Sequence, residues 1–287
     1  MAHSQPVGQT PRGLYVQLAC IWEATARKPG NVHRYVDFED VSYVDFLVSA
    51  AAIAPVMDTA LDRSVGETVL ESVKRTRQVT DTNTNLGIIL LLAPLAAIPD
   101  GEELGVGIER VLDVLTIEDS KQVYEAIRIA QPGGLGEVED QDVREVPTLP
   151  LREIMAMAAD RDSIAKQYVE AFGPMIAATR AVFDRGIERG EPLERSIIEL
   201  YLWYLSHHRD TLVERKCGEV QAKEIQRQAL EVQRESEPTV RERKFQELDV
   251  YLRADGNRRN PGTTADLVAG SLYLALREGI ITPLCRW

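Results

Sequence analysis

The sequence of 287 residues contains few aromatic residues and few cysteines. Phe, Trp and Tyr make up 6% of the chain, whereas Ala, Leu, Glu and Arg are abundant, a composition that favours helices over strands. The three cysteines, Cys20, Cys217 and Cys285, are scattered and form no Cys-x-x-Cys pair. We therefore interpret them as reduced thiols of a cytoplasmic protein.

Motifs that define several enzyme classes are missing from the sequence. There is no HExxH helix or paired Cys-x-x-Cys for zinc, and no Walker A motif. The glycines at 133–136 are not a dinucleotide fingerprint, because no strand precedes them. The polar first residues lack the apolar run of a signal peptide, and the longest apolar run, 86–98, is shorter than the about 20 residues of a membrane span. We expect neither zinc nor a membrane partner.

Positive charge is also scarce. Lys and Arg total 33 against 45 Asp and Glu, which gives a formal net charge of −12. A general nucleic-acid binder needs a basic surface to displace counterions, so we expect no nucleic-acid partner. A small phosphorylated substrate remains possible if a local positive pocket or a divalent metal offsets the acidic field.

The apolar residues follow helical spacing, and no segment keeps a period of two. Residues 1–12 are expected to be a flexible tail, and 131–150, which is rich in Gly, Pro and acidic residues, a long loop. The sequence predicts an all-α fold, a single bundle of about ten helices within 13–287. The expected helices cover about 13–27, 43–60, 64–79, 86–98, 103–115, 118–130, 151–187 with a break near 173–174, 192–208, 217–236, 239–253 and 264–277.

Four polar loops carry the most distinctive residues. They read EATARKPGNVHR at 23–34, TNTNLG at 82–87, HRDTLVERKCG at 208–218 and NPGTTADL at 260–267. In this order and at these separations they resemble the motifs of the triphosphoribosyl-dephospho-CoA synthase family, over about residues 13–280. The resemblance implies an ATP-dependent transferase that moves a triphosphoribosyl unit from ATP to the ribose 2′-hydroxyl of 3′-dephospho-CoA and releases adenine.

Two motifs depart from the family pattern. Asn-Thr-His-Lys-Gly is replaced by residues 83–87, NTNLG, and the glycine-rich motif at 133–137, GGLGE, lacks its arginine. The loss of these cations predicts weaker phosphate binding or a different acceptor. Two alternatives therefore stay open: an ATP-using enzyme of one-carbon cofactor biosynthesis, on methanopterin or methanofuran precursors, and a non-catalytic helical protein that binds nucleotide.

The charged residues of the motifs are the candidates for chemistry. Such a reaction needs groups for the triphosphate, a base for the attacking hydroxyl and stabilisation of the departing adenine. We assign Glu23 and Asp210 as catalytic candidates, and Glu137 and Asp142 as candidate ligands of Mg²⁺, which takes one or two carboxylates plus phosphates. The alternative for these acids is a solvated surface. The phosphate- and substrate-binding candidates are Lys28, Gly30, Asn31, His33, Arg34, Arg215 and Gly218, with Lys216 as a further cation.

Two helix N-termini are the remaining candidates. Asn83, Thr84 and Asn85 precede an apolar helix, whose free N–H groups could hold an anion, or which they could simply cap. Thr263 and Asp266 pose the same question at the last helix, where capping is the favoured interpretation for Thr263. The region 214–247 alternates acids and bases, which is typical of exposed helix faces and leaves a homo-oligomer interface possible.

Overall fold

A computed structural model describes residues 12–132 and 141–287. In these residues the chain forms fourteen α-helices and one 3-10 helix, with one isolated bridge between His33 and Val36 and no strand. The predicted all-α class is confirmed, although the helices outnumber the ten expected. They are α1 Arg12–Thr25, α2 Tyr43–Asp58, η1 Ala60–Asp62, α3 Val65–Arg77, α4 Leu86–Ala96, α5 Leu104–Asp113, α6 Ile117–Ala130, α7 Leu151–Ala158, α8 Ser163–Val169, α9 Gly173–Glu188, α10 Leu193–His207, α11 Thr211–Cys217, α12 Glu219–Arg234, α13 Pro238–Arg253 and α14 Gly262–Arg277.

The break expected near 173–174 within 151–187 is confirmed, because α9 begins at Gly173, but a second break, between α7 and α8, was not expected. Asp162 begins α8, and its carboxylate accepts hydrogen bonds from the backbone N–H groups of Ile164 and Ala165. Ala171 and Phe172 then adopt left-handed backbone angles, with φ of 46° and 57°, before α9 begins. The short helix α11 was not expected, since seven residues are too few to show a clear period.

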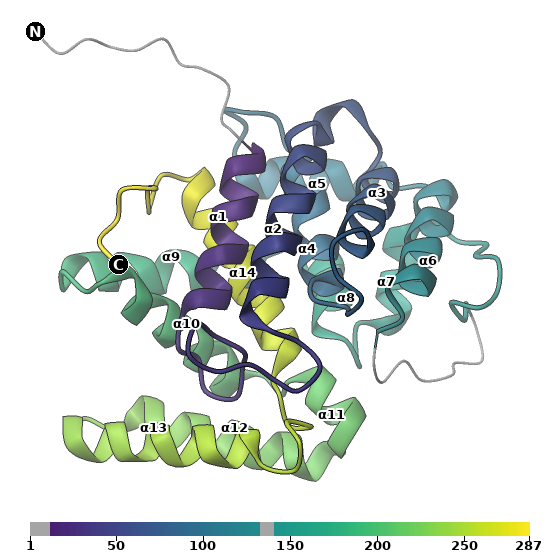
Figure 1. Cartoon of the computed structure of the whole chain (residues 1–287). Helices are drawn as coiled ribbons and strands as arrows, with labels where there is room; N and C mark the ends of the chain where they lie inside the picture. Colours follow the sequence, from purple (N-terminus) through teal and green to yellow (C-terminus); the bar gives the residue numbers. More distant parts are fainter. Residues whose placement is uncertain (1–11, 133–140) are drawn as a thin grey trace, which may run out of the picture.

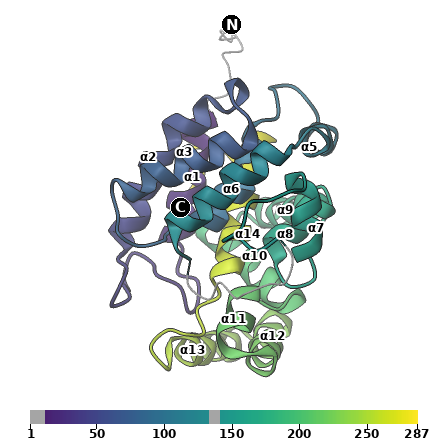
Figure 2. The same cartoon turned by 90° about the vertical axis from the view of Figure 1, so that its right-hand side faces the viewer.

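Helices α4 and α14 form the centre of the molecule (Figures 1 and 2). Ten of the eleven residues of α4 and twelve of the sixteen of α14 are buried, as expected for helices that are apolar on all sides. The two helices run parallel: Gly87 approaches Asp266 at their N-terminal ends, and Arg277 donates to the carbonyl of Ile98 at the other. Both helices therefore begin at the same end of the core.

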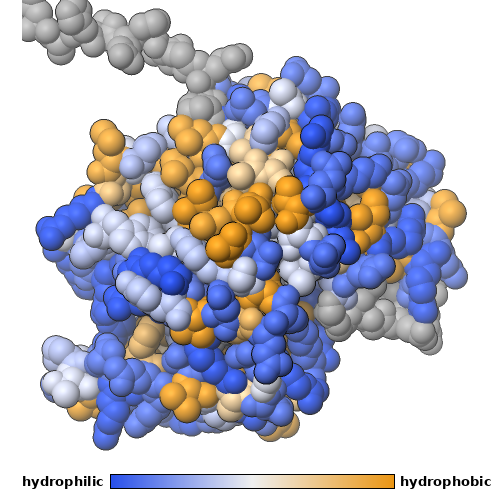
Figure 3. Space-filling model, in the orientation of Figure 1, coloured by the Kyte–Doolittle hydropathy of each residue, from blue (hydrophilic) through white to orange (hydrophobic). Residues whose placement is uncertain are grey.

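The pair α12 and α13 forms a separate layer at that end of the molecule (Figure 1). One apolar stripe of α12, formed by Ile225, Ala229 and Val232, is buried in the core that includes α10. Much of the outer surface in this view is hydrophilic, with an apolar area over α1 and α2 (Figure 3). Within the described residues, no helix is long and apolar enough to cross a membrane.

Candidate active site

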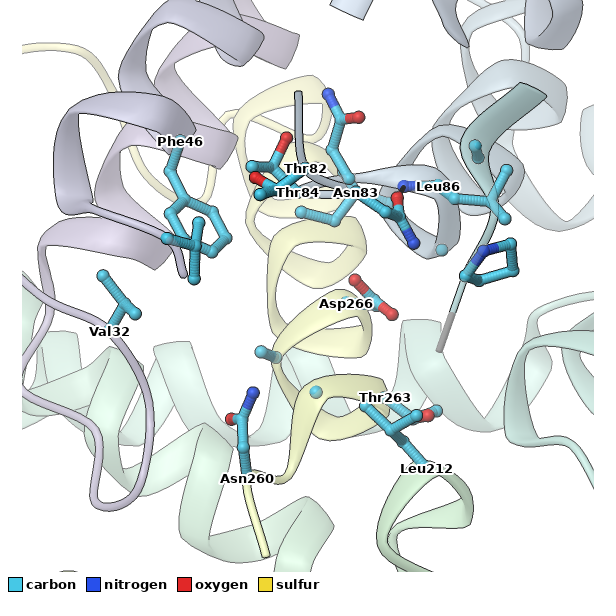
Figure 4. Close-up of a pocket in the computed structure, with 18 of the residues that line it drawn as sticks. Val32, Phe46, Thr82, Asn83, Thr84, Leu86, Leu212, Asn260, Thr263 and Asp266 are labelled. Carbon is cyan, nitrogen blue, oxygen red and sulfur yellow. Dashed lines mark hydrogen bonds between the residues drawn. The ribbon is translucent and has the colours of Figure 1, made fainter. Parts of the chain in front are cut away.

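A cavity of about 790 Å³ lies where the N-terminal ends of α4 and α14 meet. Each of the four sequence motifs contributes to its wall (Figure 4). The volume lies in the upper part of the range usual for small-molecule sites, about 300–1,000 Å³, so it suits a ligand as large as a nucleotide. The predicted site residues that line it are Glu23, Asn31, Asn83, Thr84, Asn85, Arg215, Thr263 and Asp266.

Glu23 and Lys28 form a buried ion pair at the cavity wall. The Glu23 carboxylate lies 2.9 Å from Lys28 Nζ, and the Lys28 side chain has no exposed area. The Lys28 ammonium also donates to the carbonyls of Glu23 and Ala26, so its three N–H donors all have acceptors within the protein. Lys28 therefore lies behind Glu23, outside the lining of the cavity, and holds the Glu23 side chain in position.

Asp266, one turn into α14, projects into the middle of the cavity (Figure 4). No described residue donates a hydrogen bond to its carboxylate or forms an ion pair with it. Burial and the neighbouring carboxylates of Glu23, Asp210 and Asp162 raise the pKa of Asp266 well above its usual range, and Arg215 offsets this only in part. A carboxyl group with a raised pKa and no partner among the described residues therefore lies inside the cavity.

Gly87 makes room for the Asp266 side chain. A β-carbon at Gly87 would lie 2.1 Å from Asp266 Oδ2 and 2.7 Å from Ile164 Cδ1, closer than real atoms approach. Any side chain at this position would thus displace the carboxylate. The glycine of the second motif is explained by this close approach between α4 and α14.

The three polar residues before α4 line the cavity and also hold its wall together. Asn83 Oδ1 accepts a hydrogen bond from the Leu86 N–H at 3.1 Å, whereas Asn85, the N-cap residue of α4, makes no side-chain capping bond. The Thr84 hydroxyl pairs with Ser49 Oγ at 2.6 Å, and Asn85 Nδ2 donates to Thr76 Oγ1 at 3.2 Å. Their side chains fix the loop, and its backbone borders the cavity.

The N-terminus of α14 is capped from outside the helix, and the prediction that Thr263 caps it is wrong. The helix follows Pro261, and the Thr263 hydroxyl instead accepts from Thr211 Oγ1 at 3.3 Å. The cap comes from Asp210, whose Oδ2 accepts from the N–H and hydroxyl of Thr264 at 2.7 and 2.8 Å.

Asp210 also caps α11, so one carboxylate joins two helices. Its Oδ1 accepts from the N–H of Val213 at 2.9 Å. Burial raises the pKa of Asp210, and the hydrogen bonds from Val213 and Thr264 oppose the rise. Asp210 is 3% exposed and does not line the cavity, so the structure places this catalytic candidate where it fixes α11 against α14.

Cationic side chains gather at the end of the cavity formed by α11 and the turn before α14. Arg215 forms an ion pair with Asp162 at 2.7 Å, and the Arg258 guanidinium donates to the carbonyl of Lys216 at 3.2 Å. Arg215, Lys216 and Arg258 all line the cavity, as does Arg77 from the end of α3. Sequence reasoning missed Arg77 and Arg258, which lie a few residues before the second and fourth motifs and belong to neither.

An apolar wall was also missed. Val32 follows the first motif's glycine, and Phe46 comes from the first turn of α2; both lie on one side of the cavity (Figure 4). Phe38 and Val41, from the loop between them, complete this wall. Three of the four belong to no motif. The sequence indicates this wall only through the apolar residues of a loop, Phe38 and Val41, which lie outside any predicted helix.

Several candidates of the first and third motifs lie outside the cavity lining. Gly30, with φ of 76°, packs against Leu252 and donates its N–H to Asp249 at 2.7 Å. His33 is buried, which lowers its pKa to about 4 together with the charges of Arg253 and Lys28.

Arg34 and Gly218 lie outside the lining as well. Arg34 pairs with Glu194 at 3.1 Å, and its guanidinium lies over the rings of Tyr35 and Trp287. Gly218 separates α11 from α12 with φ of 86°. The two residues therefore shape the surroundings of the site.

Of the two predicted metal ligands, only Asp142 can be placed relative to the cavity. Glu137 lies outside the described residues. Asp142 pairs with Arg144, with Oδ1 2.8 Å from Arg144 Nε, and does not line the cavity. Among the described residues, no group of three or more His, Cys, Asp or Glu could hold a metal by itself. A metal at this site would need ligands from the substrate, as Mg²⁺ bound to phosphates has.

Comparisons with known proteins agree on one family. The family model of the ATP:dephospho-CoA triphosphoribosyl transferases matches residues 12–282. A crystal structure of a candidate triphosphoribosyl-dephospho-CoA synthase from Archaeoglobus fulgidus is similar at 29% identity and a TM-score of 0.65, over 82% of this chain and 100% of that one. No curated protein matches the sequence.

Proposed function

The chain belongs to the family of ATP:dephospho-CoA triphosphoribosyl transferases, and we propose that it transfers the triphosphoribosyl unit of ATP in the cavity at the start of α4 and α14. The observation that carries this proposal is the convergence of all four motifs on one cavity. The acceptor is the ribose 2′-hydroxyl of dephospho-CoA, adenine is released, and the triphosphate stays intact.

The triphosphate binds at the cationic end of the cavity in this proposal. Arg215, Lys216 and Arg258 surround the N-terminus of α14, where Gly262 and Thr263 border the same space. A helix N-terminus favours anions through its free N–H groups and its dipole, and arginine adds charge-assisted hydrogen bonds to phosphate oxygens. These groups supply a local positive region within a chain of net charge −12.

The metal of the reaction is proposed to be Mg²⁺. Asp162 lines the cavity at its cationic end, where it pairs with Arg215 at 2.7 Å. One carboxylate fits the small protein share that Mg²⁺ takes when phosphates provide the other ligands. When bound, the ion would offset triphosphate charge, and Asp162 would hold it together with the phosphates.

The adenine lies against the apolar wall in this proposal. Val32, Phe38 and Phe46 offer flat apolar surface, and the amides of Asn31 and Asn83 border it. A purine ring needs this combination of apolar contact and a few polar groups at its edges. With the triphosphate at the other end, the ribose C1 would lie between the two regions.

Chromatography of the protein incubated with ATP, Mg²⁺ and 3′-dephospho-CoA tests the proposal. We expect free adenine together with a heavier CoA product. Arg215→Ala should raise the KM for ATP at least 10-fold, whereas Arg34→Ala, which removes an arginine outside the cavity lining, should change it little. Formation of ADP or AMP in place of adenine, or equal effects of the two substitutions, would contradict the proposal.

The altered second motif defines the alternative acceptor. Leu86 is buried, and Asn85 is engaged with Thr76, so the described residues place no cation where the resemblance expects His and Lys. An acceptor with fewer phosphates than dephospho-CoA would not need those cations. If ATP binds and no adenine appears with dephospho-CoA, precursors of one-carbon cofactors are the next acceptors to test.

A further inference from the structure

We infer that Asp266 is the proton donor to the departing adenine, and that Glu23, paired with Lys28, accepts the proton of the attacking hydroxyl. The inference rests on the proposed function and adds a division of roles between two carboxyl groups. It starts from one contrast: both groups line the same cavity, but only one of them has a cationic partner.

The position of Asp266 matches that of a leaving-group acid. Figure 4 shows its carboxyl group between the loop of Thr82 and Asn83 on one side and Asn260 and Thr263 on the other. The apolar wall and the cationic end flank this position, so the bond between ribose and adenine would lie beside it. No described residue competes for the carboxyl group, which leaves it free to donate to the base.

The surroundings of Asp266 favour the protonated form of its carboxyl group. The groups that face it are the carboxylates of Glu23 from α1, Asp162 from the start of α8 and Asp210 from the start of α11, and the charge of Arg215 opposes them in part. Like charges nearby and burial both disfavour a second ionised carboxylate. Such surroundings raise the pKa of a carboxyl group and suit it to act as an acid.

Glu23 has the opposite surroundings. Lys28 Nζ lies 2.9 Å from its Oε1, and neither side chain is more than 4% exposed. The ion pair orients the Glu23 carboxylate, whose oxygens can accept a proton. Two carboxyl groups in one site with such different partners can divide the roles of acid and base.

The step balances as a single displacement. The acceptor oxygen forms a bond to C1 of the ATP ribose, and the bond from C1 to adenine N9 breaks with its electron pair leaving on adenine. The hydroxyl proton passes to Glu23, and the Asp266 proton passes to a ring nitrogen of adenine. Neutral adenine leaves, and proton exchange with solvent restores both carboxyl groups.

The experiment compares leaving groups under single-turnover conditions with ATP and 2-fluoro-ATP. The fluorine makes the departing base a more stable anion, which needs less protonation. General acid catalysis is worth about 10²- to 10⁴-fold, so Asp266→Asn should slow the reaction of ATP at least about 100-fold. The factor by which Asp266→Asn slows the reaction of 2-fluoro-ATP should be at least 10-fold smaller than the factor for ATP. The matched control Glu23→Gln should lose the same factor with both nucleotides.

The native protein provides a second measurement that does not depend on the variant. Its single-turnover rate with ATP should fall on the alkaline side as Asp266 loses its proton, and this fall should be weaker with 2-fluoro-ATP. If the native protein releases adenine but Asp266→Asn slows both nucleotides equally, or less than 3-fold, the inference is overturned and the proposed function survives. If the native protein releases no adenine, the proposed function itself has failed.

Discussion

Replacement of Asp210 separates a structural role from a catalytic one. Asp210 lies in the third motif and is a candidate base from its sequence alone, but its carboxylate accepts three hydrogen bonds that cap α11 and α14. We expect Asp210→Ala to weaken the junction that carries Arg215 into the cavity. Its main kinetic effect should be a higher KM for ATP.

The size of the stability loss follows from those contacts. A hydrogen bond to a charged group contributes about 1.5–3 kcal/mol, and loss of an N-cap costs about 1 kcal/mol. These contributions overlap, since the same carboxylate makes them all, and a total of about 3–5 kcal/mol is expected, because the N–H groups of Val213 and Thr264 and the Thr264 hydroxyl lose their acceptor. At about 2 °C per kcal/mol for a chain of this size, the melting temperature should fall by about 6–10 °C.

Asp119 is the matched control within the same chain. It is 3% exposed, and it too joins two helix starts: Oδ1 accepts from Gly66 N–H at 2.8 Å, and Oδ2 accepts from the N–H and hydroxyl of Thr116 at 2.8 and 2.7 Å. It does not line the cavity. Asp119→Ala should therefore lower the melting temperature by a similar amount and leave the KM for ATP within about 2-fold of the native value, within the scatter expected of such comparisons.

Melting curves and steady-state kinetics, measured at a temperature where both variants are folded, provide the assay. The reasoning predicts similar melting temperatures for the two variants and a raised KM for ATP only in Asp210→Ala. A general base contributes about 10²- to 10⁴-fold. If kcat at saturating ATP falls by that factor while KM is unchanged, Asp210 acts in the chemistry and the reasoning is refuted.

Four further predictions concern the cavity. Lys28→Met leaves the Glu23 carboxylate buried without its cation, so it should lower stability by about 3–5 kcal/mol in chemical denaturation; an unchanged denaturation midpoint would argue against the pair. Gly87→Ala should reduce kcat, because a methyl group there meets Asp266 Oδ2, while Gly190→Ala, at a site with open space around it, should affect only stability. Chelation with EDTA should stop adenine release, and Mg²⁺ should restore it. The pKa of Asp266 is raised in the folded protein, so its contribution to stability is present at low pH and is lost as pH rises through that pKa. Asp266→Asn should therefore remove this part of the pH dependence of the free energy of unfolding.

The helices could largely be predicted from the sequence, because apolar spacing is a local property. α4 follows from its unbroken apolar run, and a capping box of Ser42 and Asp45 begins α2. The break before α9 follows from Gly173 and Pro174, whereas the break between α7 and α8, at residues 159–162, contains neither glycine nor proline to indicate it.

The site could be predicted only where motifs reach the cavity wall. Asp266 and Glu23 were identified, but the burial of Lys28 was not, because a lysine in a Lys-Pro-Gly turn is usually exposed. The parallel packing of α4 on α14 decides which side of each motif faces the cavity, and that contact joins residues 179 positions apart, Gly87 and Asp266. Phe46 and Arg258 also line the site because of contacts between segments that are distant in the sequence, and no local sequence pattern predicts such contacts.

A crystal structure of the protein with ATP, Mg²⁺ and no acceptor tests the central claim most directly. The account predicts the triphosphate beside Arg215, Lys216 and Arg258, with C1 of the ribose next to Asp266 and adenine against Val32 and Phe46. ATP bound outside this cavity would contradict the account. So would ATP bound with its γ-phosphate beside Asp266, because that orientation suits phosphoryl transfer and places the bond to adenine away from both carboxyl groups.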